Sequence, residues 1–205
     1  PDEQLLVPVL RSIPESIQHI NVTMGYPLSA TPVASLVEQL LSLQRNVRYR
    51  DGQPMYYFRD VLPLLNHPYV MAARQERVAA WLRQITAENR IYIRPEEVAD
   101  DDFLSVLFTP VQDTAAFSDY LIRILETLNR HLRRDDEEED EAAQTARDVE
   151  QEFVFHYFAT VNRMKEVMRE AHVEMRLDTY FRLLKKMVEL VTIPFEGEPL
   201  SGLQV

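Results

Sequence analysis

The sequence predicts a mainly α-helical fold with a few short β-strands near the two ends of the chain. Only four glycines occur among the 205 residues. Apolar residues recur three and four positions apart along most of the chain, which is the spacing of one face of a helix. The β-prone runs are short, at residues 20–24, 91–93 and 191–193. We therefore expect a helical domain whose flanking strands belong to a different part of the structure.

The elements of the first quarter follow from local signals. Residues 2–12 place four apolar side chains on one face and predict a helix. Residues 20–24 are β-prone and predict a short strand. Thr31-Pro32 is a strong helix start, because threonine is a favoured N-cap and proline is favoured at the first helical position. This helix is expected to continue to about residue 44.

The rest of the chain is predicted to be a series of helices with short connections. Residues 45–54 are expected to form a loop around Asp51-Gly52. We expect helices over residues 55–65, 69–88, 95–99, 102–108, 113–133, 141–171 and 178–190. The last of these is expected to be capped by Asp178. Residues 91–93 and 191–193 are expected to be extended, and residues 199–205 to end the chain in a strand-like run.

Two apolar clusters are interpreted as core packing. One is a stripe in the helix predicted over residues 141–171, formed by Phe153, Phe155, Tyr157, Phe158, Val161, Met164 and Met168. The other surrounds the single tryptophan, Trp81, with Val78, Leu82 and Ile85. Apolar side chains at helical spacing form a buried face far more often than a cofactor site.

The charge of −11 is carried by the second half of the chain. Residues 1–99 hold ten basic and ten acidic side chains, whereas residues 100–205 hold twelve and twenty-three. Residues 135–141 are seven consecutive acids, which we interpret as a solvated link between two antiparallel helices. Contact with nucleic acid depends on local positive potential, so any such contact is expected in the first half. The acidic half is better suited to a protein partner.

The composition limits compartment and chemistry. The absence of cysteine excludes disulfides, thiolate nucleophiles and zinc–thiolate sites. No apolar run approaches the roughly 20 residues of a membrane span, and no signal peptide opens the chain. We expect a cytoplasmic protein that does not insert into a membrane.

Motifs for catalysis are missing from the sequence. No glycine is followed by the Lys-Ser/Thr of a phosphate-binding loop. No acid stands two residues before a lysine, as a PD-(D/E)XK nuclease requires. Glu152 and His156 share a helix face, but the ordinary interpretation is a side-chain contact and not a metal site. We therefore expect no catalytic residue, no metal and no cofactor within this chain.

One segment has the composition of a nucleic-acid contact. The candidate residues are Arg45, Arg48, Tyr49, Arg50, Tyr56 and Arg59. Arginine pairs with phosphates, and exposed tyrosine stacks on bases. The alternative is that Tyr57 and Phe58 belong to the core and that the arginines are simply solvated.

Three stretches resemble a known family. The run Asn21-Val22-Thr23-Met24-Gly25-Tyr26-Pro27-Leu28, followed by Thr31-Pro32, resembles the segment after helicase motif IV in AddB-like, PD-(D/E)XK-containing members of the RecB/UvrD superfamily. Residues 191–205 resemble the strand that leads into motif V. Asn66-His67-Pro68-Tyr69 also recurs in that family. Gly25-Tyr26 stands where UvrD-type members have Gly-Gly.

The resemblance implies a place within a larger protein. Residues 1–30 and 191–205 would belong to the helicase core, with Thr23, Gly25 and Tyr26 in the motif-IV-like turn. Residues 31–190 would form the 2B-like accessory domain between motifs IV and V. The parent would be a helicase-like protein with a RecB-type nuclease, acting in double-strand-break repair and recombination. ATP and magnesium would bind only in other parts of that parent.

The two chain ends agree with this interpretation. The chain opens on Pro1-Asp2 without an initiator methionine and ends within an apolar, β-prone run. We therefore expect an internal piece of a longer protein, with its ends close together. Two alternatives stay open, a docking module for a partner helicase subunit that never contacts DNA and a helical enzyme.

Overall fold

The computed structural model describes residues 20–21, 25–98, 102–111, 113–133, 141–172, 175–194 and 203–204, and the fold is mainly α-helical, as predicted. The helices are η1 (Leu28–Ala30), α2 (Pro32–Arg45), α3 (Phe58–Leu65), α4 (Pro68–Ala87), α5 (Pro95–Val98), α6 (Asp102–Leu107), α7 (Thr114–Leu132), α8 (Glu141–Ala171) and α9 (Leu177–Glu189). The predicted helix over residues 2–12, Thr23 and the acids 135–140 lie outside the described residues.

The strands form three small sheets. The strands are β1 (Ile20–Asn21), β2 (Tyr26–Pro27), β3 (Arg48–Arg50), β4 (Gln53–Tyr57), β5 (Tyr92–Ile93), β6 (Thr192–Ile193) and β7 (Leu203–Gln204). Strand β1 pairs with β7 in parallel, β2 pairs with β6 antiparallel, and β3, β4 and β5 form an antiparallel sheet in that order. Extended segments were predicted at the positions of β1, β5, β6 and β7, whereas β2, β3 and β4 were not predicted.

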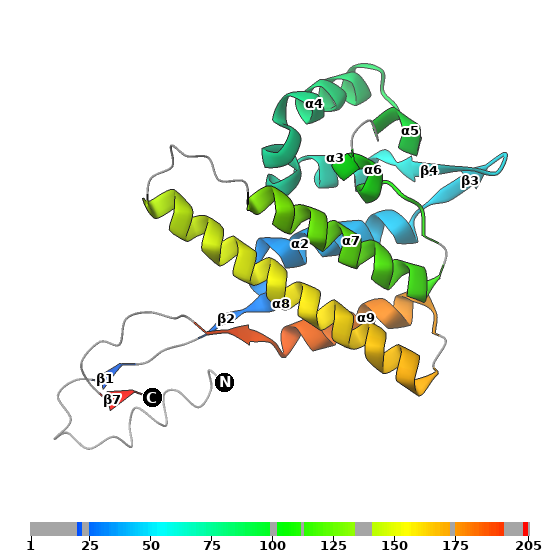
Figure 1. Cartoon of the computed structure of the whole chain (residues 1–205). Coiled ribbons are helices and arrows are strands. Elements are labelled where there is room, and N and C mark those ends of the chain that lie inside the picture. The colour runs from blue at the N-terminus through cyan, green and yellow to red at the C-terminus, as the bar shows by residue number, and fades with distance from the viewer. Residues whose placement is uncertain are drawn as a thin grey trace.

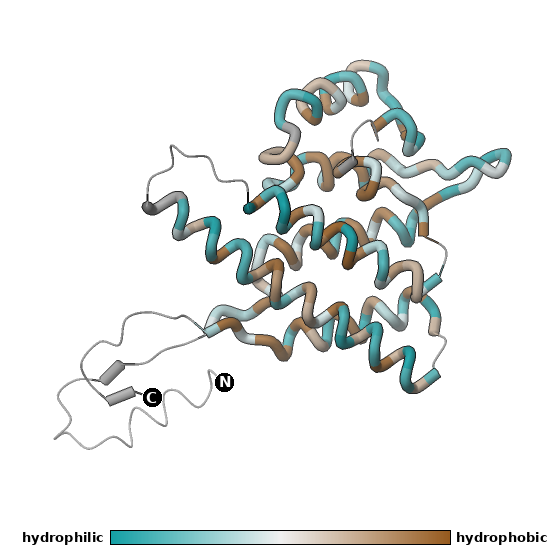
Figure 2. The backbone as a smooth tube through the Cα atoms, in the orientation of Figure 1, coloured by the Kyte–Doolittle hydropathy of each residue, from teal (hydrophilic) through white to brown (hydrophobic). Residues whose placement is uncertain are grey.

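Helices α2, α7, α8 and α9 pack together as the main bundle (Figure 1). Helices α7 and α8 form the most extensive pair and run in opposite directions, as the sequence predicted. Hydrophobic residues concentrate where the helices face one another, and hydrophilic residues cover their outer sides (Figure 2). Burial of these apolar faces is the main source of the bundle's stability.

The aromatic stripe of α8 is core, with one exception. Phe153, Tyr157, Val161 and Met164 are buried, and Phe158 and Met168 pack against the core. The prediction for Phe155 is wrong, since its side chain is 63% exposed. Phe155 lies two positions from both Phe153 and Tyr157, and residues two apart on a helix point in different directions.

The tryptophan cluster of α4 follows the prediction. Val78 and Ile85 are buried, while Trp81 and Leu82 are partly buried against the core.

The structure confirms the predicted cap at Thr31 and shows a further cap at Asp113. The Thr31 hydroxyl accepts from the Ala34 N–H at 3.4 Å, with Pro32 at the first helical position. Asp113 caps α7 by accepting from the Ala116 N–H at 2.7 Å. The predicted cap at Asp178 is wrong, because α9 starts after Arg176 without a side-chain cap. Asp178 instead lies in the first turn, where its charge is favourable to the helix dipole.

A second layer, formed by α3–α6 and the β3–β4–β5 sheet, is fixed to the bundle through the end of α6. The Tyr56 hydroxyl donates to the Phe108 carbonyl at 2.9 Å, and the Tyr120 hydroxyl donates to the Leu107 carbonyl at 2.6 Å. The Gln44 side chain of α2 donates to the Thr109 carbonyl at 2.9 Å and accepts from the Val111 N–H at 3.1 Å. Side chains from β4, α7 and α2 thus satisfy the carbonyls at the end of one short helix, which would otherwise have no partner.

The two ends of the described domain meet in the β2–β6 pair. Tyr26 stands opposite Ile193, and its ring stacks on Phe153 of α8 with 5.6 Å between centroids. A Cβ atom on Gly25 would lie 2.9 Å from the Thr192 side chain, so the close approach of the two strands requires glycine there. Strand β1 also pairs with β7, in parallel, and the expectation that the two ends of the helical domain lie close together is confirmed.

His67 joins the starts of α2 and α4. It is 3% exposed; its Nε2–H donates to the Pro32 carbonyl at 3.2 Å, and its Nδ1 accepts from the Tyr69 N–H at 3.3 Å. Both bonds fit a neutral ring with the proton on Nε2. Burial lowers the pKa of His67 from its usual 6.5, because desolvation disfavours the charged form.

The lowered pKa predicts acid sensitivity. Below pH 6.5 the unfolded chain binds the His67 proton before the folded chain does. The contribution to stability is therefore complete above pH 6.5 and falls as the pH drops toward the folded pKa, by at most about 1.4 kcal/mol per pH unit. In His67→Asn, which retains a capping side chain, this part of the pH dependence is expected to disappear from urea denaturation curves. His172→Asn, at an exposed site, should leave the wild-type profile unchanged; identical profiles for all three proteins would contradict the assignment.

Candidate nucleic-acid interface

The Arg45–Arg59 segment does not form the predicted loop followed by a helix. Residues 48–57 fold into the β3–β4 hairpin, which projects from the domain at the end opposite the chain-end strands (Figure 1). The turn residues Asp51 and Gly52 have φ of 52° and 77°, which is the conformation of a two-residue type I′ turn. This turn matches the twist of paired strands, so Asp-Gly favours a hairpin at this point. Helix α3 consequently begins at Phe58 and not at residue 55.

The strand register divides the sheet into two faces. Arg48 pairs with Met55, Arg50 with Gln53, and Tyr57 with Tyr92. Paired residues share a face, and side chains alternate along a strand. The residues of this face, here called the outer face, are Arg48, Arg50, Gln53, Met55, Tyr57 and Tyr92. The opposite face carries Tyr56 and Ile93, which are 1% and 0% exposed and therefore belong to the core.

Two of the predicted arginines lie on the outer face and are exposed. Arg48 and Arg50 are two positions apart on β3, about 7 Å along the strand. Arg50 lies 4.0 Å from Asp51 in a fully solvated pair, which is worth little. Tyr49 is on the other face but extends past the core and is 50% exposed. The hairpin is mostly hydrophilic toward its tip (Figure 2).

The expectation that Tyr56 is available for stacking is wrong. Its ring is buried edge-on against Phe108, with 5.7 Å between centroids, and its hydroxyl bonds the Phe108 carbonyl. Burial also raises the pKa of the Tyr56 hydroxyl. Tyr56 is therefore a structural residue that holds β4 to α6.

The two remaining candidates lie off the hairpin. Arg45 is the last residue of α2 and lines the groove between α2 and α9. Arg59 is exposed in the first turn of α3, with its guanidinium carbon 5.9 Å from the centre of the Phe58 ring. Neither belongs to the outer face.

The structure adds two aromatic residues that the sequence did not select. Tyr57 and Tyr92 lie side by side on the outer face, 5.9 Å between centroids, and Tyr92 is 46% exposed. They are 35 positions apart in the sequence and meet because β5 pairs with β4. Nothing in the sequence pattern indicates this pairing, although residues 91–93 were correctly predicted to be extended.

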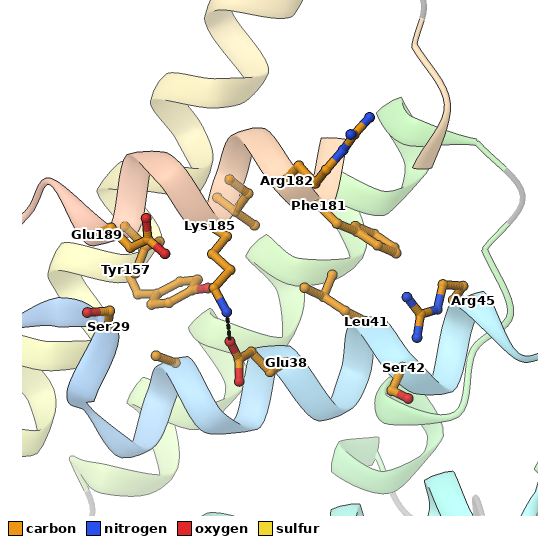
Figure 3. Close-up of a pocket in the computed structure, with 13 residues that line it drawn as sticks. Ser29, Glu38, Leu41, Ser42, Arg45, Tyr157, Phe181, Arg182, Lys185 and Glu189 are labelled. Carbon is orange, nitrogen blue, oxygen red and sulfur yellow. Dashed lines mark hydrogen bonds and ion pairs between the residues drawn. The ribbon is translucent and has the colours of Figure 1, made fainter. Parts of the chain in front are cut away.

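Elsewhere on the described part of the chain, a groove between α2 and α9 has a volume of about 440 Å³. Figure 3 shows Leu41 and Phe181 at its floor and Arg45 at one end. Glu38 and Lys185 form an ion pair across it at 3.2 Å. This pair offsets the charge of Glu38, and the hydroxyl of Ser42, which also lines the groove, donates to the Asp60 carboxylate at 2.8 Å.

Two surface acids among the described residues have pKa values below the usual range. Arg90 holds the pKa of Glu88 below its usual value, and Lys186 does the same for Glu189. Both acids lie on the surface, whereas a buried general acid would have a raised pKa. His156 contacts Glu152 at 3.1 Å, the helix-face contact expected from the sequence. Within the described ranges no group of three acidic or histidine side chains could hold a metal ion.

Comparisons with protein-family models, with curated proteins and with solved structures found no match to this chain. Among the described helices, none has both the length and the apolar character that crossing a membrane requires.

Proposed function

We propose that this chain is a non-catalytic accessory domain of a cytoplasmic DNA helicase or nuclease that acts in double-strand-break repair and recombination. In this proposal the domain contacts nucleic acid through the outer face of the β3–β4–β5 sheet. The observation that carries the proposal is the outward position of Arg48 and Arg50 on a projecting hairpin. Arginines in that position can approach a phosphate backbone without obstruction by the bundle.

Strands from before and after the helices pair with each other, which supports a helical domain inserted into a larger protein. Strand β2 precedes the helices and β6 follows them, yet they are neighbours in one small sheet. Strands β1 and β7 pair in parallel, as two strands of a larger parallel sheet would. A helical domain held in this way fits between two strands of a helicase core, and ATP and magnesium would bind in that core.

Removing the two hairpin arginines is expected to weaken nucleic-acid binding. The purified chain is titrated into a fluorescent duplex with a single-stranded tail, and anisotropy is followed at increasing salt. Arg48→Ala/Arg50→Ala is expected to bind less tightly and to reduce the slope of log affinity against log salt by about 2, one for each phosphate contact. Arg163→Ala/Arg169→Ala removes two exposed arginines from α8 and serves as the matched control.

The result can contradict the proposal in two ways. Absence of binding by the wild-type chain at low salt would exclude direct contact by this domain. An equal loss of nucleic-acid affinity in the hairpin variant and in the α8 control would show that binding depends only on the overall charge of the chain.

A docking role for a partner helicase subunit is the second candidate. It is favoured by large apolar side chains exposed on the bundle, Phe155 of α8 at 63% and Leu190 after α9 at 84%. Aromatic side chains are enriched in protein–protein interfaces relative to the rest of the surface. Failure of nucleic-acid binding together with loss of subunit binding in Phe155→Glu would support this role instead.

A further inference from the structure

We infer that the outer face binds single-stranded nucleic acid, with Tyr92 as the surface on which a base stacks and Arg48 and Arg50 as its phosphate contacts. The inference rests on the proposed function and specifies the ligand of the same face. Its basis is the combination of an exposed aromatic ring with arginines on one side of one sheet.

Tyr92 is held in a position suited to stacking. Its ring lies beside Tyr57, which in turn packs edge-on against Phe58 at 4.9 Å between centroids. The Phe58 N–H donates to the Ile91 carbonyl at 3.0 Å, so the backbone next to Tyr92 is fixed as well. Tyr57 and Phe58 are partly buried, whereas Tyr92 is 46% exposed. One aromatic ring is therefore presented to solvent on an aromatic support.

The Tyr92 ring and the two arginines lie in a line along the outer face. The Met55–Arg48 pair is two positions from the Tyr57–Tyr92 pair along β4, about 7 Å, and Arg50 is about 7 Å farther toward the tip. A strand of nucleic acid that crosses the sheet along this line would meet an aromatic surface first and two cationic side chains next. Single-strand binding sites combine these two features.

The face favours single strands over duplexes because of what each exposes. In a duplex the bases are stacked on one another, and only their edges can be reached from a groove. In a single strand the bases can unstack and lie against an aromatic side chain. The exposed ring of Tyr92 can therefore stack on a base of a single strand but not on a base of a duplex.

The charges around the face agree with an anionic ligand. Glu88 and Glu97, which flank β5 in the sequence, are both bound by Arg90. The exposed Arg94 directly follows β5. Asp51 lies at the hairpin tip, beyond the arginine pair. The six residues of the outer face itself include two arginines and no acid, although the whole chain carries a charge of −11.

The test compares two probes with the full 205-residue chain. A fluorescent single strand of about 15 nucleotides covers the site sizes of known single-strand binding folds. A blunt duplex of the same length is the second probe. We expect tighter binding of the single strand, a loss of about 5- to 150-fold in Tyr92→Ala, and near wild-type affinity in Tyr92→Phe.

Tyr49→Ala is the matched control, since Tyr49 is similarly exposed on the same three-stranded sheet but on its opposite face. It is expected to change single-strand affinity by less than about twofold, within the range of a neutral surface substitution. Tyr92→Leu keeps apolar bulk against Tyr57 and removes the aromatic ring, so it replaces Tyr92→Ala if that variant does not fold. Circular dichroism of each variant checks folding.

The outcomes separate this inference from the proposed function. Tighter duplex binding that depends on Arg48 and Arg50 but not on Tyr92 would overturn the single-strand inference and leave the proposed function standing. An equal loss of single-strand affinity in Tyr49→Ala and Tyr92→Ala would overturn the assignment of the binding site to the outer face. Failure of both probes to bind at low salt would overturn both proposals.

Discussion

Gln44→Leu is expected to lower the free energy of unfolding by about 2–4 kcal/mol. The Gln44 side chain donates to the Thr109 carbonyl at 2.9 Å and accepts from the Val111 N–H at 3.1 Å. Gln44 is 2% exposed and Val111 7%, so water does not readily replace the lost partner. Leucine has a similar size but leaves a backbone donor and an acceptor without partners, at about 1–3 kcal/mol each. Urea denaturation followed by circular dichroism measures the change.

Gln39→Leu on the same helix is the matched control and is expected to have the opposite or no effect. The Gln39 side-chain oxygen is buried and has no hydrogen-bond partner in the described part of the chain. Replacing a buried polar atom without a partner by an apolar group removes a desolvation cost. Equal destabilisation by the two substitutions would mean that the bonds made by Gln44 do not matter and that α2 simply does not accept leucine.

Tyr180→Ala is expected to be the most damaging single change in the core, at about 3–5 kcal/mol. Tyr180 of α9 is 0% exposed and packs edge-on against Phe117 of α7, with 5.5 Å between ring centroids. Its hydroxyl bonds the Ser118 hydroxyl at 2.9 Å, and burial raises its pKa to about 12. Alanine would leave a cavity between two helices, and the same helix leads directly into β6.

Two further variants distinguish the contribution of packing from that of the hydrogen bond at Tyr180. Tyr180→Phe keeps the ring and loses only the hydroxyl bond, so a loss of about 1 kcal/mol is expected. Phe155→Ala removes a large aromatic side chain from an exposed site on α8 and should change stability by less than about 0.5 kcal/mol. A loss in Tyr180→Phe as large as in Tyr180→Ala would contradict the packing argument.

The sequence predicted most helices because their signals are local. Thr31-Pro32, Asp113 and the apolar spacing of the long helices specify starts and faces within a few residues of each position. The prediction for Phe155 failed because the stripe was read as one continuous apolar run. The residues that share its buried side, such as Phe153, Tyr157 and Val161, follow the helical spacing of four.

The candidate interface was harder to predict because its faces depend on long-range pairing. Asp51-Gly52 is a local hairpin signal, but the adjoining strand is only Arg-Tyr-Arg and lacks apolar alternation. The exposure of Tyr49, Tyr56 and Tyr57 depends on the register between β4 and β5. It also depends on which face of the sheet packs against the helices. A shift of one residue would exchange the two faces. Sequence composition therefore located the segment but assigned Tyr56 to the wrong environment and did not select Tyr92.

The β2–β6 pair brings the two ends of the helical domain side by side, so the domain can be inserted into another protein as one unit. Tyr26 and Ile193 lie directly opposite each other, so a host protein would need to offer only two attachment points about 5 Å apart. Any surface hairpin provides such a pair of points, and loop closure would impose little entropic cost on the host. Transplanting residues 25–194 into a hairpin turn of an unrelated protein should therefore leave both folds intact, with Gly25 retained at the junction.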